Sequence, residues 1–527
     1  MRLNKFIQIC LIFLLLFSVF VRFYKLNTVP PHLSNDEISI AYDAYSISGN
    51  QKDEHNKHLP IAFESHGTYK APGYLYILSP LYLFLPNTNL TPKLPSVIFG
   101  FLTIFVIFGI TLLLTNNKII SMISAIILLS CPWHITVSRM VLESNLALFF
   151  LSLGLLISLF SIIKKKDKYL FLSIVPFTIS MYCYHTEWGL APILFLILLV
   201  FFRKNKKCLV RCAFLFLLLT LPLLINYLDN IHTSARANTE IIWKEESTAS
   251  LIKNSPKILT PFIVSKAFLE KYFEYTNVDY LFFNGSELLG SKNIFEQGLF
   301  LWPLIIPFFY GFFFLRKYIK KPFLSFFIIW TLISPLIPSL THGSPSLIRN
   351  LNSVIPYTII ISIGLFEIFR KFKYLSMVLS CLILISSFYF GSIYLFHYPL
   401  EKAEGFQGYY PITEFLKRDS QKYNHIYIDY KFGSSCQYIG VPHLYLAYYQ
   451  KFNPEILQNR TRDSFGMDFD KYTVTQIDWN DIDFHSRDLY IVSICNQPVP
   501  RILDKIKLVT KFTDQAGNPA FELWEAK

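Results

Sequence analysis

Hydrophobic segments of roughly the length of a membrane-spanning helix alternate with polar connections along the first three quarters of the chain. Runs such as Phe6 to Phe20 and Leu375 to Phe390 contain no charged residue, and their length and number favour transmembrane helices over buried helices of a soluble core. We expect eleven spans, near 5–23, 96–115, 119–137, 143–163, 169–184, 189–202, 209–228, 299–315, 323–340, 351–369 and 374–396. The pattern predicts a polytopic α-helical membrane protein.

The connections fall into two sets that differ in charge. One set is basic and has Asp167 and the nearby Glu367 as its only acids; it lies near 2–5, 116–118, 164–168, 203–211, 316–321 and 370–373. The positive-inside rule places these connections, and the N-terminus, in the cytoplasm. The opposite set includes the long loops 24–95 and 229–298 and holds the histidines. We therefore expect a multi-pass protein of the plasma membrane whose outer face carries its chemistry.

Composition agrees with this topology. Of the 527 residues 53% are hydrophobic and only 16% are charged, well below the roughly 25% of soluble domains. The net charge of +13 would suit a nucleic-acid partner, but the basic loops account for it and we expect none. The first twenty-odd residues resemble a signal peptide, yet their apolar run is long and no small-x-small site precedes Arg22, so an uncleaved first span is predicted.

The tail after the last span differs from the rest. It is polar and rich in tyrosine, and its alternating runs at 425–430 and 488–493 predict strands, with a helix around 412–423. We expect a transmembrane module over 1–396 and a small extracytoplasmic α/β domain over 397–527. Cys436 and Cys495 lie in this domain, and a disulfide between them is an option that the sequence leaves open. The other six cysteines are expected to pack as small apolar residues.

Adjacent acids follow the first span, in Asn35-Asp36-Glu37. One interpretation is a helix N-terminus capped by Ser34 or Asn35, where the dipole favours both carboxylates. The other is a carboxylate that accepts a proton. The two are compatible, because a cap can hold a catalytic acid in place.

Two basic residues lie at positions that a bound anion would account for. Lys70 lies in Gly67-Thr-Tyr-Lys-Ala-Pro-Gly73, and Arg349 opens span ten after His342. A guanidinium at the membrane edge is costly unless it meets an anion, and a phosphate is a suitable one. Snorkelling to lipid headgroups is the alternative for Arg349.

Further candidate substrate contacts gather at other outer span ends. Arg139 and Glu143 are four residues apart and could pair on one helix face, or Glu143 could face the cavity of Asp36. His185, Glu187 and His342 are candidates too, although an interfacial aromatic belt explains Tyr184 and Trp188 beside the first two.

No metal site is predicted. The group His55, His58 and His66 with Asp53, Glu54 and Glu64 has no recognised ligand spacing and is expected to be a solvated loop. The chain contains no Walker loop, GxSxG or HExxH motif.

Several of these motifs together resemble the GT-C membrane glycosyltransferases, in particular the protein O-mannosyltransferase and aminoarabinose-transferase branch (glycosyltransferase family 39-like). The similarity covers roughly 15–200 and, less well, 330–370. It rests on Arg22, Asp36-Glu37, the stretch 49–60, Tyr69-Lys70-Ala71-Pro72, Lys93-Leu94-Pro95-Ser96, Pro132-Trp133-His134 and Ser138-Arg139. The chain departs from the family at Lys93, where Arg is usual, and at Ala71, where Pro is usual, which weakens Lys93 as a phosphate ligand.

The resemblance implies inverting transfer of a hexose or pentose from a polyprenyl-phosphate donor to an acceptor hydroxyl of a protein, lipid or glycan. Asp36 would be the general base, with Glu37 supporting it, and Lys70 and Arg349 would hold the lipid phosphate. No cofactor is required, and a divalent metal stays compatible. A polyprenol-linked sugar flippase or transporter is the alternative, but it predicts ionisable residues in mid-span, where this chain has almost none. A non-enzymatic receptor would leave the charged residues at the span ends unexplained.

Overall fold

The computed structural model describes residues 4–65, 68–200, 206–229, 241–285, 297–343, 345–401, 409–432, 436, 438–462, 466–513 and 517–527; His66 lies outside them. The chain forms two compact units. The first comprises 1–24, 61–74 and 94–393, and the second comprises 25–60, 75–93 and 394–527. Most of the first outer loop therefore belongs to the same unit as the tail.

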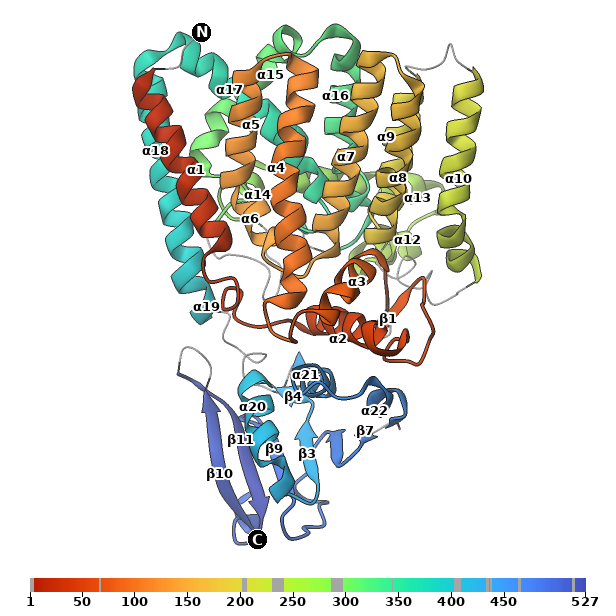
Figure 1. Cartoon of the computed structure of the whole chain (residues 1–527), viewed down its shortest axis with the longest axis vertical. Helices are drawn as coiled ribbons and strands as arrows, with labels where there is room; N and C mark the ends of the chain where they lie inside the picture. Colours follow the sequence, from red (N-terminus) through yellow and green to blue (C-terminus); the bar gives the residue numbers. More distant parts are fainter. Residues whose placement is uncertain are drawn as a thin grey trace. The chain divides into compact units, whose positions relative to one another are not determined.

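The first unit is a bundle of helices that run alongside one another (Figure 1). A helix forms within each expected span: α1 (Lys5–Phe23), α4 (Leu94–Thr115), α5 (Lys118–Ser130) with α6 (Pro132–Ser138), α7 (Glu143–Lys164), α8 (Asp167–Cys183), α9 (Glu187–Leu199), α10 (Lys206–Asp229), α15 (Ile305–Tyr318), α16 (Lys321–Ile333), α17 (Val354–Lys371) and α18 (Lys373–Ser392). The long loop after α10 contains α12 (Glu246–Asn254), α13 (Thr260–Thr276) and α14 (Val278–Phe282).

Among the helices of the described ranges, seven are long and apolar enough to cross a membrane, and the bent pair α5 and α6, which meet at 59°, would make eight. This confirms a polytopic helical membrane protein. Helices α8, α9 and α15 have 17, 13 and 14 residues, short for the roughly 20 that a span needs. The count of eleven stays a prediction.

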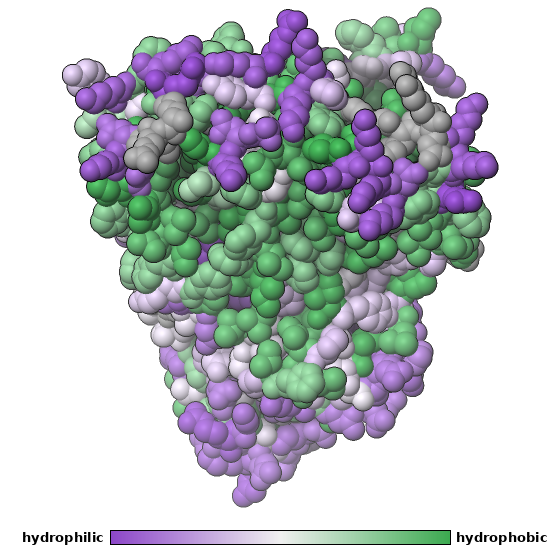
Figure 2. Space-filling view, turned by 45° about the horizontal axis from the view of Figure 1, so that its top comes forward, coloured by the Kyte–Doolittle hydropathy of each residue, from purple (hydrophilic) through white to green (hydrophobic). Residues whose placement is uncertain are grey.

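The hydrophobic surface of this unit lies on the sides of its helices. Figure 2 shows hydrophobic side chains over these sides and hydrophilic ones gathered where the helices end. Phe313 of α15 and Phe214 of α10 are 81% and 66% exposed, as expected for residues that face lipid. By contrast α17 is buried along its whole apolar stretch. Its Glu367 accepts hydrogen bonds from Lys317 and Arg370 among the basic residues predicted to be cytoplasmic.

Arg22 fixes the bend between α5 and α6. Its buried guanidinium donates to the carbonyls of Leu128 and Leu129 and to Ser138 Oγ, and Nη2 lies 2.9 Å from His134 Nδ1. Pro132, which has no N–H to offer, opens α6 directly after α5 ends, so the last carbonyls of α5 need another donor. Arg22 supplies it from the end of α1.

The second unit contains a seven-stranded sheet in the order β10-β11-β9-β3-β8-β7-β6. Its strands are β3 (Ile426–Asp429), β6 (Thr461–Arg462), β7 (Gly466–Phe469), β8 (Tyr472–Thr475), β9 (Leu489–Ser493), β10 (Ile506–Thr513) and β11 (Pro519–Ala526). The central strand β3 is parallel to both β9 and β8, and the outer pairings are antiparallel. The helices are α20 (Tyr409–Asp419), α21 (Pro442–Tyr449), α22 (Pro454–Gln458) and, from the first outer loop, α2 (Asn35–Asn50). The strands and the helix expected in the tail are confirmed.

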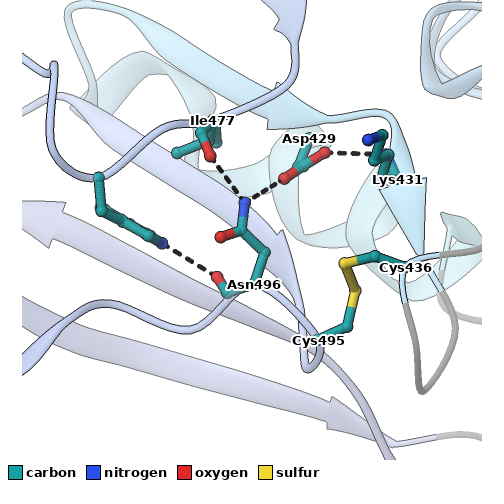
Figure 3. The surroundings of a disulfide bond; sticks show 7 residues. Asp429, Lys431, Cys436, Ile477, Cys495 and Asn496 are labelled. Carbon is teal, nitrogen blue, oxygen red and sulfur yellow. Dashed lines mark hydrogen bonds between the residues drawn. A yellow bond between two sulfur atoms is a disulfide. The ribbon is translucent and has the colours of Figure 1, made fainter.

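A disulfide joins Cys436 to Cys495 (Figure 3). It ties the small hairpin of β4 (Lys431–Phe432) and β5 (Tyr438–Ile439) to the chain that leaves β9. Beside it, Asn496 Nδ2 donates to Asp429 Oδ2 at 2.5 Å and to the Ile477 carbonyl at 2.8 Å. The hairpin is thus anchored to the sheet by a covalent bond and a buried polar network.

Lys93 holds the loop that leads from α1 to α2. It is fully buried, and its Nζ donates to the carbonyls of Leu26 and Pro30 at 3.2 and 2.9 Å. These bonds give Lys93 a structural role in place of a phosphate contact. The buried His32 lies in the same loop, and burial, together with the positive charge of Lys93, lowers the pKa of His32 to about 3.

Acid is expected to destabilise the second unit through His32. Because the pKa of His32 is lower in the folded chain than in the unfolded chain, its contribution is complete above about pH 6.5 and is lost as the pH falls towards 3. The loss should reach about 2 kcal/mol near pH 5. Thermal unfolding at pH 7 and pH 5 tests this, since His32→Gln should show a smaller decrease in Tm than the parent. Equal decreases would contradict the assignment.

Candidate active site

Helix α2 presents Asp36 and buries Glu37. Ser34 is the N-cap: its Oγ accepts from the Glu37 N–H at 3.4 Å, while Glu37 Oε2 accepts from the Ser34 N–H at 2.9 Å. This reciprocal pair is a capping box and confirms the predicted helix start. Glu37 is 1% exposed, whereas Asp36 is exposed. The cap therefore fixes the backbone on both sides of Asp36 and leaves that carboxylate accessible.

The segment that follows Lys70 packs tightly against the end of α8. Lys70 ends β2 (Thr68–Lys70), which pairs with β1 (Phe63–Ser65), and only 6% of this residue is exposed. Three residues later a Cβ at Gly73 would lie 2.6 Å from Cys183 Sγ and 2.8 Å from the Tyr182 carbonyl oxygen. Only glycine allows this approach, so the Lys70 segment is fixed against the end of α8.

Two acidic residues begin helices that pack against α8. Glu143 begins α7 and Glu187 begins α9. Glu187 is 1% exposed, and its Oε1 accepts a 2.6 Å hydrogen bond from Asn352 Nδ2. Asn352 lies three residues after Arg349, so this bond links the α9 end to the turn that carries Arg349.

The turn that carries Arg349 is held in place by hydrogen bonds to α6 and α13. Trp133 Nε1 of α6 donates to the Leu347 carbonyl at 2.8 Å, and Tyr275 Oη of α13 accepts from the Ser346 N–H at 3.2 Å. Arg349 Nη1 donates to Thr341 Oγ1 at 2.9 Å and to the His342 carbonyl at 3.3 Å. The half-buried guanidinium is therefore oriented by its own turn, which also carries His342.

These contacts bring together most of the predicted site residues of the first unit. The segment of Lys70 packs against the end of α8 through Gly73, α7 and α9 pack against α8, and Asn352 joins the turn of Arg349 to Glu187. His185 and His342 lie on these connecting segments. Asp36 and Glu37 belong to the second unit.

Comparison with known proteins identifies this architecture. Residues 69–226 match the family of dolichyl-phosphate-mannose-protein mannosyltransferases. The fold is similar to that of ArnT from Cupriavidus metallidurans in the apo state, with a TM-score of 0.56 and 11% identity over 97% of each chain. It is also similar to the oligosaccharyltransferase AglB from Archaeoglobus fulgidus, with a TM-score of 0.50 and 13% identity over 85% of this chain and 64% of AglB. None of the curated protein sequences matches the chain.

The family match over residues 69–226 and the similarity of fold support a glycosyltransferase of the GT-C superfamily. The expected family and enzyme class are confirmed. The family match contains Lys70, Arg139, Glu143 and His185 of the predicted site. It does not extend to Asp36 or Arg349.

Arg139 and Glu143 do not share a helix face, and the structure therefore contradicts the interpretation in which they pair on one helix. Helix α6 ends at Ser138 and α7 begins at Glu143, so the chain between them is not helical. Arg139 is fully buried and donates to the carbonyls of Val21 and Tyr24, the latter at 2.9 Å. These are terminal carbonyls of α1, and Arg139 therefore completes the end of that helix.

Replacing Arg139 by methionine, which keeps the length of the side chain, should destabilise the fold. Loss of the charged donor should lower the free energy of unfolding by about 1.5–3 kcal/mol, with the KM for the donor unchanged. Thermal unfolding in detergent together with donor titration measures both quantities. Arg316→Met, at an exposed end of α15, is the control and should change stability by less than about 0.5 kcal/mol. A raised KM with unchanged stability would instead indicate a substrate contact.

The acidic part of the first loop is not the solvated segment we expected. Asp53 and Glu54 are 0% and 5% exposed. Glu54 lies 3.2 Å from His55 Nε2 and 3.5 Å from Arg460 Nη2. Burial alone would raise the pKa of Glu54, but the bond from His55 and the charge of Arg460 hold it below its usual range. Across the described ranges no group of three or more His, Cys, Asp or Glu side chains could hold a metal ion.

Sequence reasoning missed the residues that support the site. Asn352, Trp133 and Tyr275 each connect the Arg349 turn to another element. Asn352 left a signal as a polar residue at the start of a predicted span, and Trp133 belongs to a motif of the family resemblance, but neither was assigned a supporting role.

Proposed function

We propose that this GT-C glycosyltransferase transfers a sugar, with inversion, from a polyprenyl-phosphate donor to an acceptor hydroxyl at the outer face of the plasma membrane. The observation that carries the proposal is that the segments bearing Lys70, Glu143, Glu187 and Arg349 are joined by direct packing and by the hydrogen bond from Asn352 to Glu187. Structures of ArnT bound to undecaprenyl phosphate and of AglB in complex with an inhibitory peptide and a dolichol-phosphate add support.

The charge on the phosphate explains the need for cations. A polyprenyl-phosphate sugar is a phosphodiester with one negative charge, and cleavage of its C1–O bond leaves a phosphomonoester with two. The extra charge develops in the transition state, where fixed donors stabilise it most effectively. Lys70 supplies a compact ammonium and Arg349 a planar fork that matches two phosphate oxygens.

The proton of the acceptor goes to Asp36. The acceptor oxygen forms a bond to C1 on the face opposite the phosphate, the C1–O bond breaks, and the Asp36 carboxylate takes the hydroxyl proton. Glu37 supports this step by maintaining the helix start. Glu143, His185 and His342 are retained as candidate contacts to sugar or acceptor, whereas Arg139 completes the end of α1. No cofactor is required by this chemistry, and a divalent metal at the phosphate is compatible with it.

The orientation belongs to the same proposal. The basic loops place the N-terminus in the cytoplasm, and eleven spans would place the C-terminal domain outside. A sugar flippase or transporter is less well supported, since a transport route needs polar groups along the spans and the candidate site residues lie at or beyond span ends.

A transfer assay tests the proposal. Purified protein would be mixed with undecaprenyl phosphate carrying different labelled hexoses and pentoses, and with membranes of the native cells lacking this chain as the source of acceptor. We expect one donor to yield labelled acceptor only when the protein is present. Failure of every donor, with the protein folded, would overturn the proposal.

A further inference from the structure

The tail of the second unit holds the segment that carries the two acids. Two hydrogen bonds connect them: Asn35 Nδ2 donates to the Ile439 carbonyl at 2.8 Å, and Tyr445 Oη donates to the Leu33 carbonyl. Leu33 and Asn35 flank the N-cap Ser34, and Asp36 follows. The tail therefore forms a hydrogen bond to the residue on each side of the N-cap.

Tyr445 lies at the centre of this connection. It belongs to α21, which packs against α2, and is 2% exposed. Burial, the neighbouring Tyr449 and Tyr409, and the carboxylates of Glu37 and Asp36 raise the pKa of Tyr445 well above its usual range. Its hydroxyl therefore keeps its proton near neutral pH and remains a donor.

The Ile439 carbonyl is also fixed in place. Gly440 follows it, and a Cβ there would lie 2.2 Å from Tyr409 Oη. The Tyr409 ring in turn stacks on Tyr445 with centroids 4.8 Å apart. The β4–β5 hairpin that contains Ile439 is tied to the end of β9 by the Cys436–Cys495 disulfide. The two hydrogen bonds therefore come from parts of the tail that are packed against each other, namely the β4–β5 hairpin and α21.

We infer that the C-terminal domain is a positioning element for the proton-accepting step, and that Tyr445 and Asn35 are its positioning residues, acting through the backbone that precedes Asp36. The inference rests on the proposed role of Asp36. It gives the domain a function in the reaction.

The kinetic test uses Tyr445→Phe, which removes only the hydroxyl. We expect the single-turnover rate constant to fall about tenfold, with the amplitude unchanged. Mere loss of folded enzyme would lower the amplitude instead. Tyr490→Phe is the matched control, because Tyr490 is a buried tyrosine of β9 whose hydroxyl has no hydrogen-bond partner among the described residues, and it should leave the rate unchanged.

The combination with Asp36→Asn separates this inference from the proposed function. If Tyr445 acts through Asp36, Tyr445→Phe should not slow the Asp36→Asn enzyme further. An unchanged rate in Tyr445→Phe alone, or the same fold-loss in both backgrounds, would overturn the positioning role. Full activity of Asp36→Asn would instead overturn the assignment of the base.

Hydrogen exchange gives a test that does not depend on activity. In Tyr445→Phe and in Asn35→Ala, amides of residues 34–38 should exchange several-fold faster than in the parent chain, and in Tyr490→Phe they should not. Unchanged exchange in Tyr445→Phe and Asn35→Ala would overturn the inference even if transfer is observed.

Discussion

Replacing Asp36 by asparagine should lower kcat by about 10²–10⁴-fold, the usual contribution of a general base. Asparagine keeps the size and hydrogen-bonding ability of the side chain but cannot accept the acceptor proton. Affinity for the donor should remain, because we propose that Lys70 and Arg349 bind the phosphate. Single-turnover transfer and equilibrium binding of undecaprenyl phosphate measure the two quantities separately.

Glu37→Gln provides a closely matched control. Glutamine also completes a capping box, so α2 should keep its start and kcat should stay within a few-fold of the parent. The two neighbouring acids therefore have opposite predicted outcomes for the same loss of one charge. A large loss of kcat in Glu37→Gln, with little effect in Asp36→Asn, would show that our proposal assigns proton transfer to the wrong residue.

Arg349→Ala should lower kcat/KM by about 10²–10³-fold and weaken the binding of undecaprenyl phosphate. The guanidinium is expected to bind the phosphate in the ground state and more strongly as charge develops. Lys70→Ala should act in the same direction. Arg349→Lys should recover only part of the loss, because an ammonium lacks the planar fork.

Two controls separate phosphate binding from other effects of Arg349→Ala. Thr341→Val removes the side-chain acceptor of Arg349 Nη1 and would reproduce the loss if Arg349 merely braced its turn. Lys253→Ala removes one exposed positive charge from α12 and should have little effect. Undiminished binding of undecaprenyl phosphate in Arg349→Ala would exclude its phosphate role.

Features encoded locally could be predicted from the sequence. Long apolar runs predicted the helices of the first unit, and the alternation of apolar and polar residues predicted β3 and β9. The spacing of Ser34 and Glu37 predicted the start of α2. Each depends on residues within a few positions of one another, so the periodicity carries the information.

Features that depend on distant residues could not be predicted. The sequence suggested a solvated loop at Glu54 because its partner Arg460 lies 406 residues later. The pairing of Cys436 with Cys495 and the link from Glu187 to Asn352 are likewise set by tertiary packing. The break after Ser138 agrees with the connection between the expected spans 119–137 and 143–163, and it excludes the pairing of Arg139 with Glu143 on one helix face.

The helix break also changes the interpretation of the site. Because Arg139 donates its hydrogen bonds to carbonyls at the end of α1, the cations that we propose for phosphate binding are Lys70 and Arg349. The acids divide in a similar way, since Glu37 belongs to the cap and Asp36 is exposed.

The fate of the donor tests the central claim most directly. Proteoliposomes containing the purified protein would be given an undecaprenyl-phosphate sugar labelled in the sugar, together with acceptor membranes, and the products separated by chromatography and examined by NMR. We predict one undecaprenyl phosphate for each sugar transferred, with the anomeric configuration inverted. Movement of the intact donor across the bilayer without cleavage of its C1–O bond would contradict the account and indicate a transporter.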